Sequence, residues 1–427
     1  MSSPAPISPP PPTGSSRWRQ APVALMVLGG LGVLVGGWLD LTQLAYSWLT
    51  GFMFFLSVSL GALFLVLMHH LFDAGWSVPL RRFCEHLAAL LFPWLAVLFL
   101  PVAALAPRLY AWMGKPGTAD HPALQARWPL FTPAGFYLAS ALCFLAWGVV
   151  AHNLRRASLE QDRTGAVACT YRMRRWSGAG IVLFALTLTL AAQLWMQGLM
   201  CEWFSTIYGV YYFAGSVWVA LGVVYLITLI LKQSGILEPV LHEHQFYFLG
   251  SLMLAFTVFY AYIHFSQYFV IWNGNLPEET FWYVLRERGA WRAVGLILIF
   301  GHFLLPFLAL LRIDLKLSFR WMAPLCVWIG LMHYVDLAFN IMPVLHPEGY
   351  AFRWCWLDAA CLALMGGVLA RAFGAAFRRH APYPVRDPRL REAMGHPAFC
   401  PSPLSGGELD EADALADAPP EEEESGR

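Results

Sequence analysis

Long runs of apolar residues recur along the chain and are separated by short polar stretches. A run of about twenty apolar residues is long enough to cross a bilayer as a helix. Ten runs meet this requirement: residues 21–39, 45–69, 84–106, 132–152, 178–199, 208–231, 246–271, 291–311, 321–343 and 352–373. Most end near a tryptophan, a residue that gathers where lipid headgroups meet water. The pattern therefore predicts an all-α integral membrane protein with about ten transmembrane helices.

The two ends of the chain lack such runs. Residues 1–20 are rich in proline and serine, and residues 401–427 are strongly acidic. Neither composition buries enough apolar surface to fold, so we expect both to be disordered. No apolar run with basic flanks precedes the first span, which argues against a signal peptide. The predicted order is a disordered segment 1–20, a transmembrane domain 21–373, a basic cytoplasmic segment 374–400 and an acidic tail 401–427.

Charge adds an orientation to this picture. Only 13% of the residues are charged, whereas soluble domains carry about 25%. Ten spans put both termini on one side of the membrane, and the ends and loops on that side hold 20 of the 28 Lys and Arg residues against 7 on the other side. Basic loops stay in the cytoplasm. Both termini are therefore predicted to be cytoplasmic.

Cysteine spacing argues against several cofactors. The eight cysteines form no CxxC, CxxCH or ferredoxin-like run, so we expect no covalent haem c, iron–sulfur cluster or zinc in this chain. The chain also has no phosphate-binding Walker loop and no GxSxG motif, and nothing in it indicates a nucleic-acid partner.

The remaining candidates for a functional site are ionisable residues within the spans, because an ionisable side chain in lipid is energetically costly unless it is paired or hydrated. One group lies at the cytoplasmic ends of spans two and three, and consists of His69, His70, Asp73, Arg81, Arg82, Glu85 and His86. It is either a partly hydrated helix junction or the mouth of a proton-conducting path.

A second group lies deeper and towards the outside. Two sets of polar residues each share one helical face by their spacing: Tyr260, His264 and Gln267 in span seven, and His333, Asp336 and Asn340 in span nine. His302 lies in span eight, and Asp358 lies in the outer third of span ten. The group is either a proton path or a structural hydrogen-bond network. A haem b held by His264, His302 and His333 is a weaker alternative, since no helix carries paired histidines.

One outer loop, residues 273–289, is predicted to hold its own short helix. Asn275 can cap it, Pro277 suits its first turn, and Glu278 and Glu279 favour its positive end. Phe281, Trp282 and Tyr283 would keep it in the membrane interface. The helix is either an anchor or a docking platform for an extrinsic subunit.

Four motifs carry a resemblance: HHLFDAGWSVPLRR (69–82), FYAYIHFSQYFVIWNGNLPEETFWY (259–283), HYVDLAFNIMP (333–343) and PVRDPRLREAM (384–394). In this order they resemble the second membrane subunit of alternative complex III, a bacterial quinol:cytochrome c oxidoreductase. That subunit, labelled quinone-binding subunit 2, belongs to the wider NrfD or polysulfide-reductase membrane-anchor group. The resemblance covers about residues 21–394.

The resemblance implies two four-helix bundles, spans two to five and spans six to nine, with spans one and ten peripheral. It also implies a bacterial cytoplasmic membrane and no cofactor in this chain. Haem c and iron–sulfur clusters would lie in partners: a multihaem cytochrome c and an iron–sulfur subunit, beside a sister NrfD-like membrane subunit. Quinol oxidation would take place in that sister subunit, and this chain would help to move protons.

The sequence leaves three functions open. The first is a non-redox membrane subunit of a quinol-oxidising respiratory complex, with a structural role and with a quinone contact and proton conduction undecided. The second is an independent secondary transporter, although glycine and proline collect mainly in loops and helix ends rather than breaking the spans. The third is a purely structural anchor for extrinsic redox subunits. Whether the chain is part of an enzyme depends on which of these holds.

Overall fold

The structure, a computed structural model, describes residues 16–114 and 122–394. The acidic tail and most of the proline-rich segment lie outside these residues. Residues 16–20, which the sequence assigns to the disordered segment, are helical instead. The helix extends about one turn before its apolar run, through residues such as Arg and Gln that favour helices.

Every regular element in the described part is a helix, and ten helical units are long and apolar enough to cross a membrane. The units are α1 (Ser16–Leu39), α2 (Leu41–Leu71), α3 (Val78–Ala88) with α4 (Trp94–Ala104), α8 (Pro133–Thr164), α9 (Val167–Trp195), α10 (Tyr208–Gln233), α11 (Glu243–Gly274), α13 (Gly289–Ile297) with α14 (Leu305–Leu311), α16 (Phe319–Ile341) and α17 (Cys355–Arg379). The predicted number of spans is confirmed.

Short helices join or flank the spans. At the end of the molecule that holds the first turn of α1 and the C-terminal segment, these are α15 (Ile313–Leu317), α18 (Leu390–Ala393) and η1 (Gly75–Ser77). At the opposite end, they are α5 (Ala106–Leu109), α6 (Ala111–Gly114), α7 (Pro122–Gln125), α12 (Pro277–Arg286), η4 (Gln197–Leu199), η6 (Met342–Val344) and η7 (Phe352–Trp354). We call these the terminal end and the far end.

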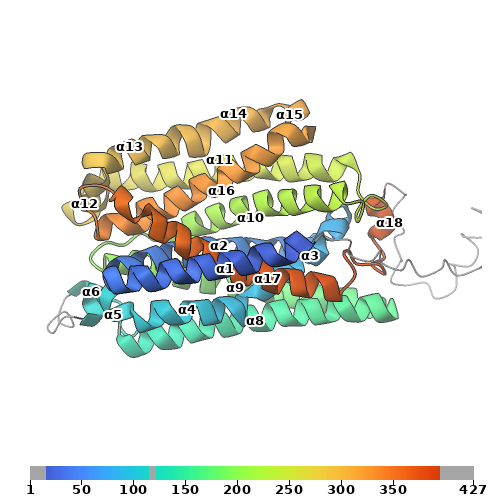
Figure 1. The fold of residues 1–427 in the computed structure, drawn as a ribbon, viewed down its shortest axis with the longest axis horizontal. Helices are drawn as coiled ribbons and strands as arrows, with labels where there is room; N and C mark the ends of the chain where they lie inside the picture. Colours follow the sequence, from blue (N-terminus) through green and yellow to red (C-terminus); the bar gives the residue numbers. More distant parts are fainter. Residues whose placement is uncertain (1–15, 115–121, 395–427) are drawn as a thin grey trace, which may run out of the picture.

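The spans form two bundles (Figure 1). In the first, α2 packs against α3, α4 and α9, and α8 packs against α9; in the second, α10 packs against α11 and α16, and α14 packs against α11. Contacts of α10 with α2 and α9 join the bundles. Helices α1 and α17 pair outside them, with α17 against α2. The two four-helix bundles and two peripheral spans are as the resemblance implies.

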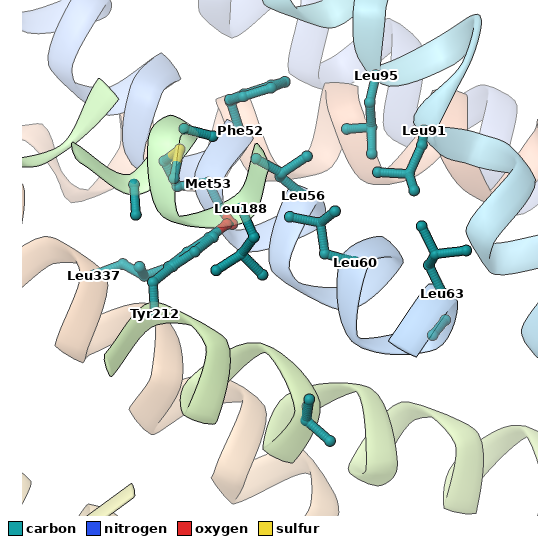
Figure 2. Close-up of a cluster of buried hydrophobic side chains, with 14 of the residues drawn as sticks. Phe52, Met53, Leu56, Leu60, Leu63, Leu91, Leu95, Leu188, Tyr212 and Leu337 are labelled. Carbon is teal, nitrogen blue, oxygen red and sulfur yellow. The ribbon is translucent and has the colours of Figure 1, made fainter. Parts of the chain in front are cut away.

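Helix α2 forms the centre of the molecule. Its side chains Phe52, Leu56, Leu60 and Leu63 are almost fully buried, and Figure 2 shows them among Leu91, Leu95, Leu188 and Tyr212 of the surrounding helices. A helix that is apolar on all sides belongs in a core. Since α2 contacts both bundles, it fixes their relative position.

Two spans are interrupted, which corrects the expectation that proline and glycine leave the spans unbroken. Span three changes from α3 to α4 through η2 (Ala89–Leu91) and Pro93. Span eight contains η5 (Leu298–Leu304), a stretch of π-helix that includes His302. Pro306 lacks the N–H that would bond to the carbonyl of His302, so the turn widens.

The outer loop contains the predicted short helix, but Asn275 has a different role. Helix α12 begins at Pro277 with Glu278 and Glu279 in its first turn, and Leu276 occupies its N-cap without a side-chain bond. Asn275 ends α11 in the left-handed conformation, with φ of 48°. Asparagine tolerates that conformation better than most residues, which suits it to a helix C-terminus.

Candidate functional site

A buried polar cluster lies in the second bundle where α10, α11 and α16 meet. Tyr211 of α10 donates a hydrogen bond to Asp336 of α16, and Asn340 Nδ2 donates to the Tyr211 hydroxyl at 2.9 Å. Tyr208 in turn donates to Asn340 Oδ1 at 3.0 Å. Asp336 has no cationic partner within ion-pair distance among the described residues. We call Tyr208, Tyr211, Asp336 and Asn340 the Asp336 cluster.

Three predicted histidines surround this cluster. His333 Nε2 lies 2.9 Å from Ser57 Oγ of α2. His302 stacks on Trp218, with ring centroids 4.5 Å apart, and neither of its buried nitrogens has a hydrogen-bond partner among the described residues. The His264 ring lies 5.6 Å from that of Tyr211. The two predicted polar faces therefore meet through α10, because Tyr211 lies between His264 and Asp336.

The far end of the Asp336 cluster is closed by α12. Arg286 donates hydrogen bonds to the carbonyls of Phe339 and Asn340 at 2.9 and 2.7 Å, and its guanidinium lies 3.4 Å from the centroid of the Trp282 ring. Burial lowers the pKa of Arg286 to about 9. These carbonyls end α16, so Arg286 stabilises the negative end of that helix. Tyr283 and Trp282 are buried with it, which makes α12 a lid as well as an interfacial helix.

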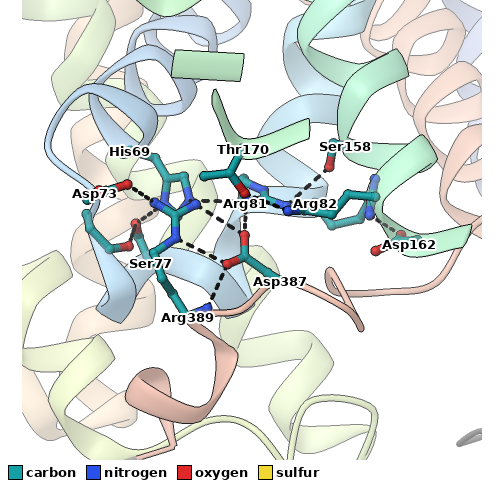
Figure 3. A network of polar contacts seen from close by, with 12 residues as sticks. His69, Asp73, Ser77, Arg81, Arg82, Ser158, Asp162, Thr170, Asp387 and Arg389 are labelled. Atoms are coloured by element: carbon teal, nitrogen blue, oxygen red, sulfur yellow. Dashed lines mark hydrogen bonds and ion pairs between the residues drawn. The ribbon is translucent and has the colours of Figure 1, made fainter. Parts of the chain in front are cut away.

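A second polar site lies at the terminal end (Figure 3). Four arginines and four carboxylates form linked ion pairs there, with Arg81 bound to Glu85 and Asp387, Arg82 to Glu85 and Asp162, Arg389 to Asp73 and Asp387, and Arg174 to Asp73. The charges balance, so this arginine network is formally neutral. Of the group that the sequence predicts here, the network contains Asp73, Arg81, Arg82 and Glu85, and it is joined by Asp162, Arg174, Asp387 and Arg389.

His69 is held within the arginine network. Arg81 and Arg389 each place a donor 3.2 Å from His69 Nε2, and arginine can only donate. Nε2 must therefore accept, and Nδ1 carries the hydrogen that bonds Ser77 Oγ at 2.6 Å. His70 lies edge-on to His69, and its nitrogens have no hydrogen-bond partner in the part of the chain that the structure describes. His69 thus orders the network and offers no free nitrogen.

The predicted basic segment folds back onto the arginine network. Asp387 is buried, and Ala393 accepts a hydrogen bond from Gln245 of α11 at 3.0 Å. Burial alone would raise the pKa of Asp387, but Arg81 and Arg389 outweigh it and hold the pKa of this carboxyl well below its usual range. Residues 380–394 therefore tie α3 to α11 across the terminal end.

Asp358 lies apart from the Asp336 cluster. It accepts a hydrogen bond from Tyr350 at the far end. Near it, His346 Nε2 lies 2.6 Å from Gln43 Oε1, and Gln43 donates to Ser47 at 3.1 Å. The sequence placed Asp358 with His333 and Asp336, whereas the structure puts it in a separate cluster between α2 and α17. Loop residues such as Tyr350 gave no sequence signal for this.

His86 is also separate from its sequence neighbours. Glu85 bonds the arginines, while the His86 ring faces α17, with its centroid 5.8 Å from that of His380.

The sequence did not indicate three residues that bond within or beside the Asp336 cluster: Tyr208, Tyr211 and Ser57. Their long-range partners could not be read from the sequence, because a tyrosine or serine in an apolar helix is common.

An apolar cavity of about 360 Å³ opens beside the arginine network. Phe64, Leu221 and Leu252 are among its lining residues, and its few polar groups come from His69, Ser77 and Arg81. It lies between α2, α10 and α11, where the bundles meet. The volume and the apolar lining with few polar groups are typical of small-molecule sites.

No group of three or more His, Cys, Asp or Glu side chains in residues 16–114 and 122–394 is placed to hold a metal ion. The chain matches no protein-family model and no curated protein sequence. A function for this chain is therefore inferred from its fold and from these sites.

Proposed function

We propose that this chain is a non-redox membrane subunit of a bacterial quinol-oxidising complex of the alternative complex III type, and that it conducts protons through its second bundle. Four motifs suggested the resemblance, and their places in the fold support it. Residues 69–82 and 384–394 join in the arginine network through Arg81 and Asp387. Residues 259–283 and 333–343 surround Tyr211.

The observation that carries the proton path is the environment of Asp336. Its side chain is buried and its bonds come from a hydroxyl and an amide, with no cation among the described residues. An ionisable side chain held this way within a membrane is a functional-site candidate, since a structural role would favour a paired one. Tyr211, Asn340 and Tyr208 extend the hydrogen-bonded chain towards the far end.

The path through this chain is a half-path. From Ser57 beside His333 to His69 in the arginine network, α2 advances twelve residues, which is about 18 Å of helix. Most side chains between them are apolar and buried. Protons that reach Asp336 from the far end therefore need water or a partner subunit to continue to the terminal end.

The cavity beside His69 supports a quinone contact in the same complex. A quinone has a small neutral head and an apolar tail, and the apolar body of the cavity suits the tail. Ser77 and His69 at its polar edge are already bonded within the protein, so this contact rests on the volume and the apolar lining. Arg81 is already bound to Glu85 and Asp387, so the site offers no free cation for a charged ligand.

The interrupted spans favour one rival function, a secondary transporter, because such proteins use broken helices at their binding sites. Purification of a tagged chain from its native membrane separates the two. A subunit brings a c-type cytochrome and quinol-oxidising activity with it, while a transporter purifies alone. If the purified chain brings neither haem nor quinol-oxidising activity with it, the proposal that it belongs to such a complex is wrong.

The proton path is tested by Asp336→Asn in the purified complex, reconstituted in vesicles. We expect assembly and haem content to stay unchanged and the number of protons moved per quinol to fall, because asparagine cannot ionise. Tyr211→Phe, which removes the hydroxyl bonded to Asp336, should act in the same direction. Asp314→Asn is the matched control, since Asp314 is exposed and pairs with Arg312 on the surface. If Asp336→Asn and Tyr211→Phe both move as many protons per quinol as the wild type, the Asp336 cluster has a structural role only.

A further inference from the structure

A basic site lies at the terminal end of the first bundle, on the side of α3 that faces α17. The His86 ring of α3 lies 5.8 Å from the His380 ring and 6.2 and 6.3 Å from the rings of Phe373 and Phe377. Burial lowers the pKa of His380, and four nearby positive charges lower it further, those of Arg155, Arg82, Arg163 and Arg379. Positive charge from α3, α8 and α17 thus gathers around one histidine.

Three buried nitrogens of this site have no hydrogen-bond partner among the residues that the structure describes. His86 is 1% exposed and neither of its nitrogens makes a hydrogen bond, and the buried Nε of Arg155 is also without one. Buried polar groups in proteins are nearly always bonded, so unbonded donors at one place point to a ligand. The donors here are imidazole and guanidinium groups, which suit an anion.

Arg82 is paired with carboxylates in the arginine network, but part of the remaining positive charge is not balanced by any carboxylate of the described residues. Glu85, the nearest carboxylate, is bound to both Arg81 and Arg82. Arg155 and Arg379 form no ion pair with any carboxylate in the part of the chain that the structure describes. This distinguishes the site from the arginine network, where four arginines face four carboxylates.

The depth of the site indicates the source of the anion. Helix α17 ends at Arg379, so His380 lies where the helix leaves the membrane. Phe377 and Phe373 precede it by about one and two turns, with stacked and partly exposed rings. A phosphate at His86 and Arg155 would place its acyl chains along these rings.

We propose that His86, Arg155, His380 and Arg379 bind the phosphate of an anionic phospholipid. Basic pockets between helices at the cytoplasmic surface bind such headgroups. The headgroup phosphate accepts hydrogen bonds from the unpartnered donors and offsets the surplus charge. The bound lipid connects α3, α8 and α17. The proposal does not depend on proton conduction or on any partner subunit.

The test measures lipid binding to the purified, delipidated full chain by native mass spectrometry with cardiolipin and, separately, phosphatidylcholine. We expect cardiolipin to remain bound preferentially. Each cation near a headgroup contributes roughly a fivefold gain in affinity, so Arg155→Gln with Arg379→Gln should weaken cardiolipin binding about 25-fold. Arg175→Gln is the matched control, since it removes one exposed charge from the same end.

Three results would overturn the proposal. If Arg175→Gln, which removes one charge, weakens cardiolipin binding as much as each substitution of the double variant does, the lipid is attracted by the basic surface as a whole and not by this site. Unchanged cardiolipin binding in the double variant would place the lipid elsewhere. Displacement of cardiolipin by millimolar inorganic phosphate would make the ligand a soluble anion. If the double variant does not fold, Arg379→Gln alone decides, because Arg379 is exposed and its loss should still weaken binding roughly fivefold.

Discussion

Glycine at position 215 sets how closely α10 approaches the histidine of α16. A β-carbon there would lie 2.8 Å from His333 Cε1 and 3.1 Å from Nδ1. His333 is bonded to Ser57 of α2 on its other side. The imidazole is therefore confined between two helices, and this glycine is required by packing rather than by a turn.

Gly215→Ala is expected to displace His333 and lengthen its bond to Ser57. Overpacking of a tight core costs roughly 1–3 kcal/mol, so the melting temperature of the purified protein should fall. Gly330→Ala on α16 is the control, because a β-carbon there meets nothing within 4 Å and alanine favours helix. Equal melting temperatures for both variants would show that His333 can move at no cost.

Asp387 is the residue whose loss should most weaken the terminal end. Asp387→Asn leaves Arg81 and Arg389 without one of their partners, and breaking a buried ion pair costs roughly 3–5 kcal/mol. Because the pKa of Asp387 is lowered in the folded state, its contribution is present above the unfolded pKa of about 3.9 and disappears as pH falls through the lower value. Thermal melts at pH 7 measure the loss.

The control for this variant is Asp314→Asn, an exposed aspartate whose pair with Arg312 should contribute little. Wild-type stability of Asp387→Asn at pH 7 would mean that residues 380–394 are not held by this carboxylate.

At the scale of the element, small residues decide where helices touch. On α1, β-carbons at Gly29 and Gly32 would lie 2.4 Å from the Leu364 nitrogen and 2.5 Å from Ala360 Cβ of α17. Small residues let membrane helices approach closely where no hydrophobic effect drives them together. Glycine lowers the helix propensity and hydrophobicity of α1, but it also allows α1 to pack closely against α17.

Sequence reasoning located the spans because their signal is local. Apolar length identified all ten, and Pro277, Glu278 and Glu279 identified the start of α12. It failed where partners are distant. Asn275 fits an N-cap and a C-terminus equally well by type, and nothing local shows that Asp387 reaches Arg81, 306 residues before it. Tyr211 likewise gains its role only through Asp336 of another helix.

The cavity between the bundles can be tested by filling it. Leu252→Trp should weaken binding of a short-chain quinone about tenfold, or about 1.4 kcal/mol, because indole occupies space that lies beside Phe64 and Leu221. Calorimetric titration of the purified protein measures the affinity. Leu331→Trp is the control, since Leu331 of α16 is 52% exposed and does not line the cavity. Equal affinities in both variants would place the quinone elsewhere.

At the scale of the whole molecule, the two ends differ in chemistry. The terminal end holds a neutral network of arginines and carboxylates together with surplus basic residues around His380. The far end holds tyrosine, asparagine and one buried arginine, closed by α12. Between them lies the apolar core around α2, which includes Phe52, Leu56 and Leu60.

The orientation of this asymmetry is the last prediction. Alkaline phosphatase, which is active only outside the cytoplasm, is fused after Asn273 at the far end or after Arg163 at the terminal end. Because basic loops remain in the cytoplasm, we expect activity at Asn273 and none at Arg163. These positions close α11 and α8 at opposite ends of the bundles. A cytoplasmic reporter such as β-galactosidase at both sites is the control and should give the reverse pattern. Phosphatase activity at Arg163 would show that the orientation is the reverse of the predicted one, with the arginine network outside the cytoplasm. Asp336 would then lie nearer the cytoplasm, and protons would enter the half-path from that side.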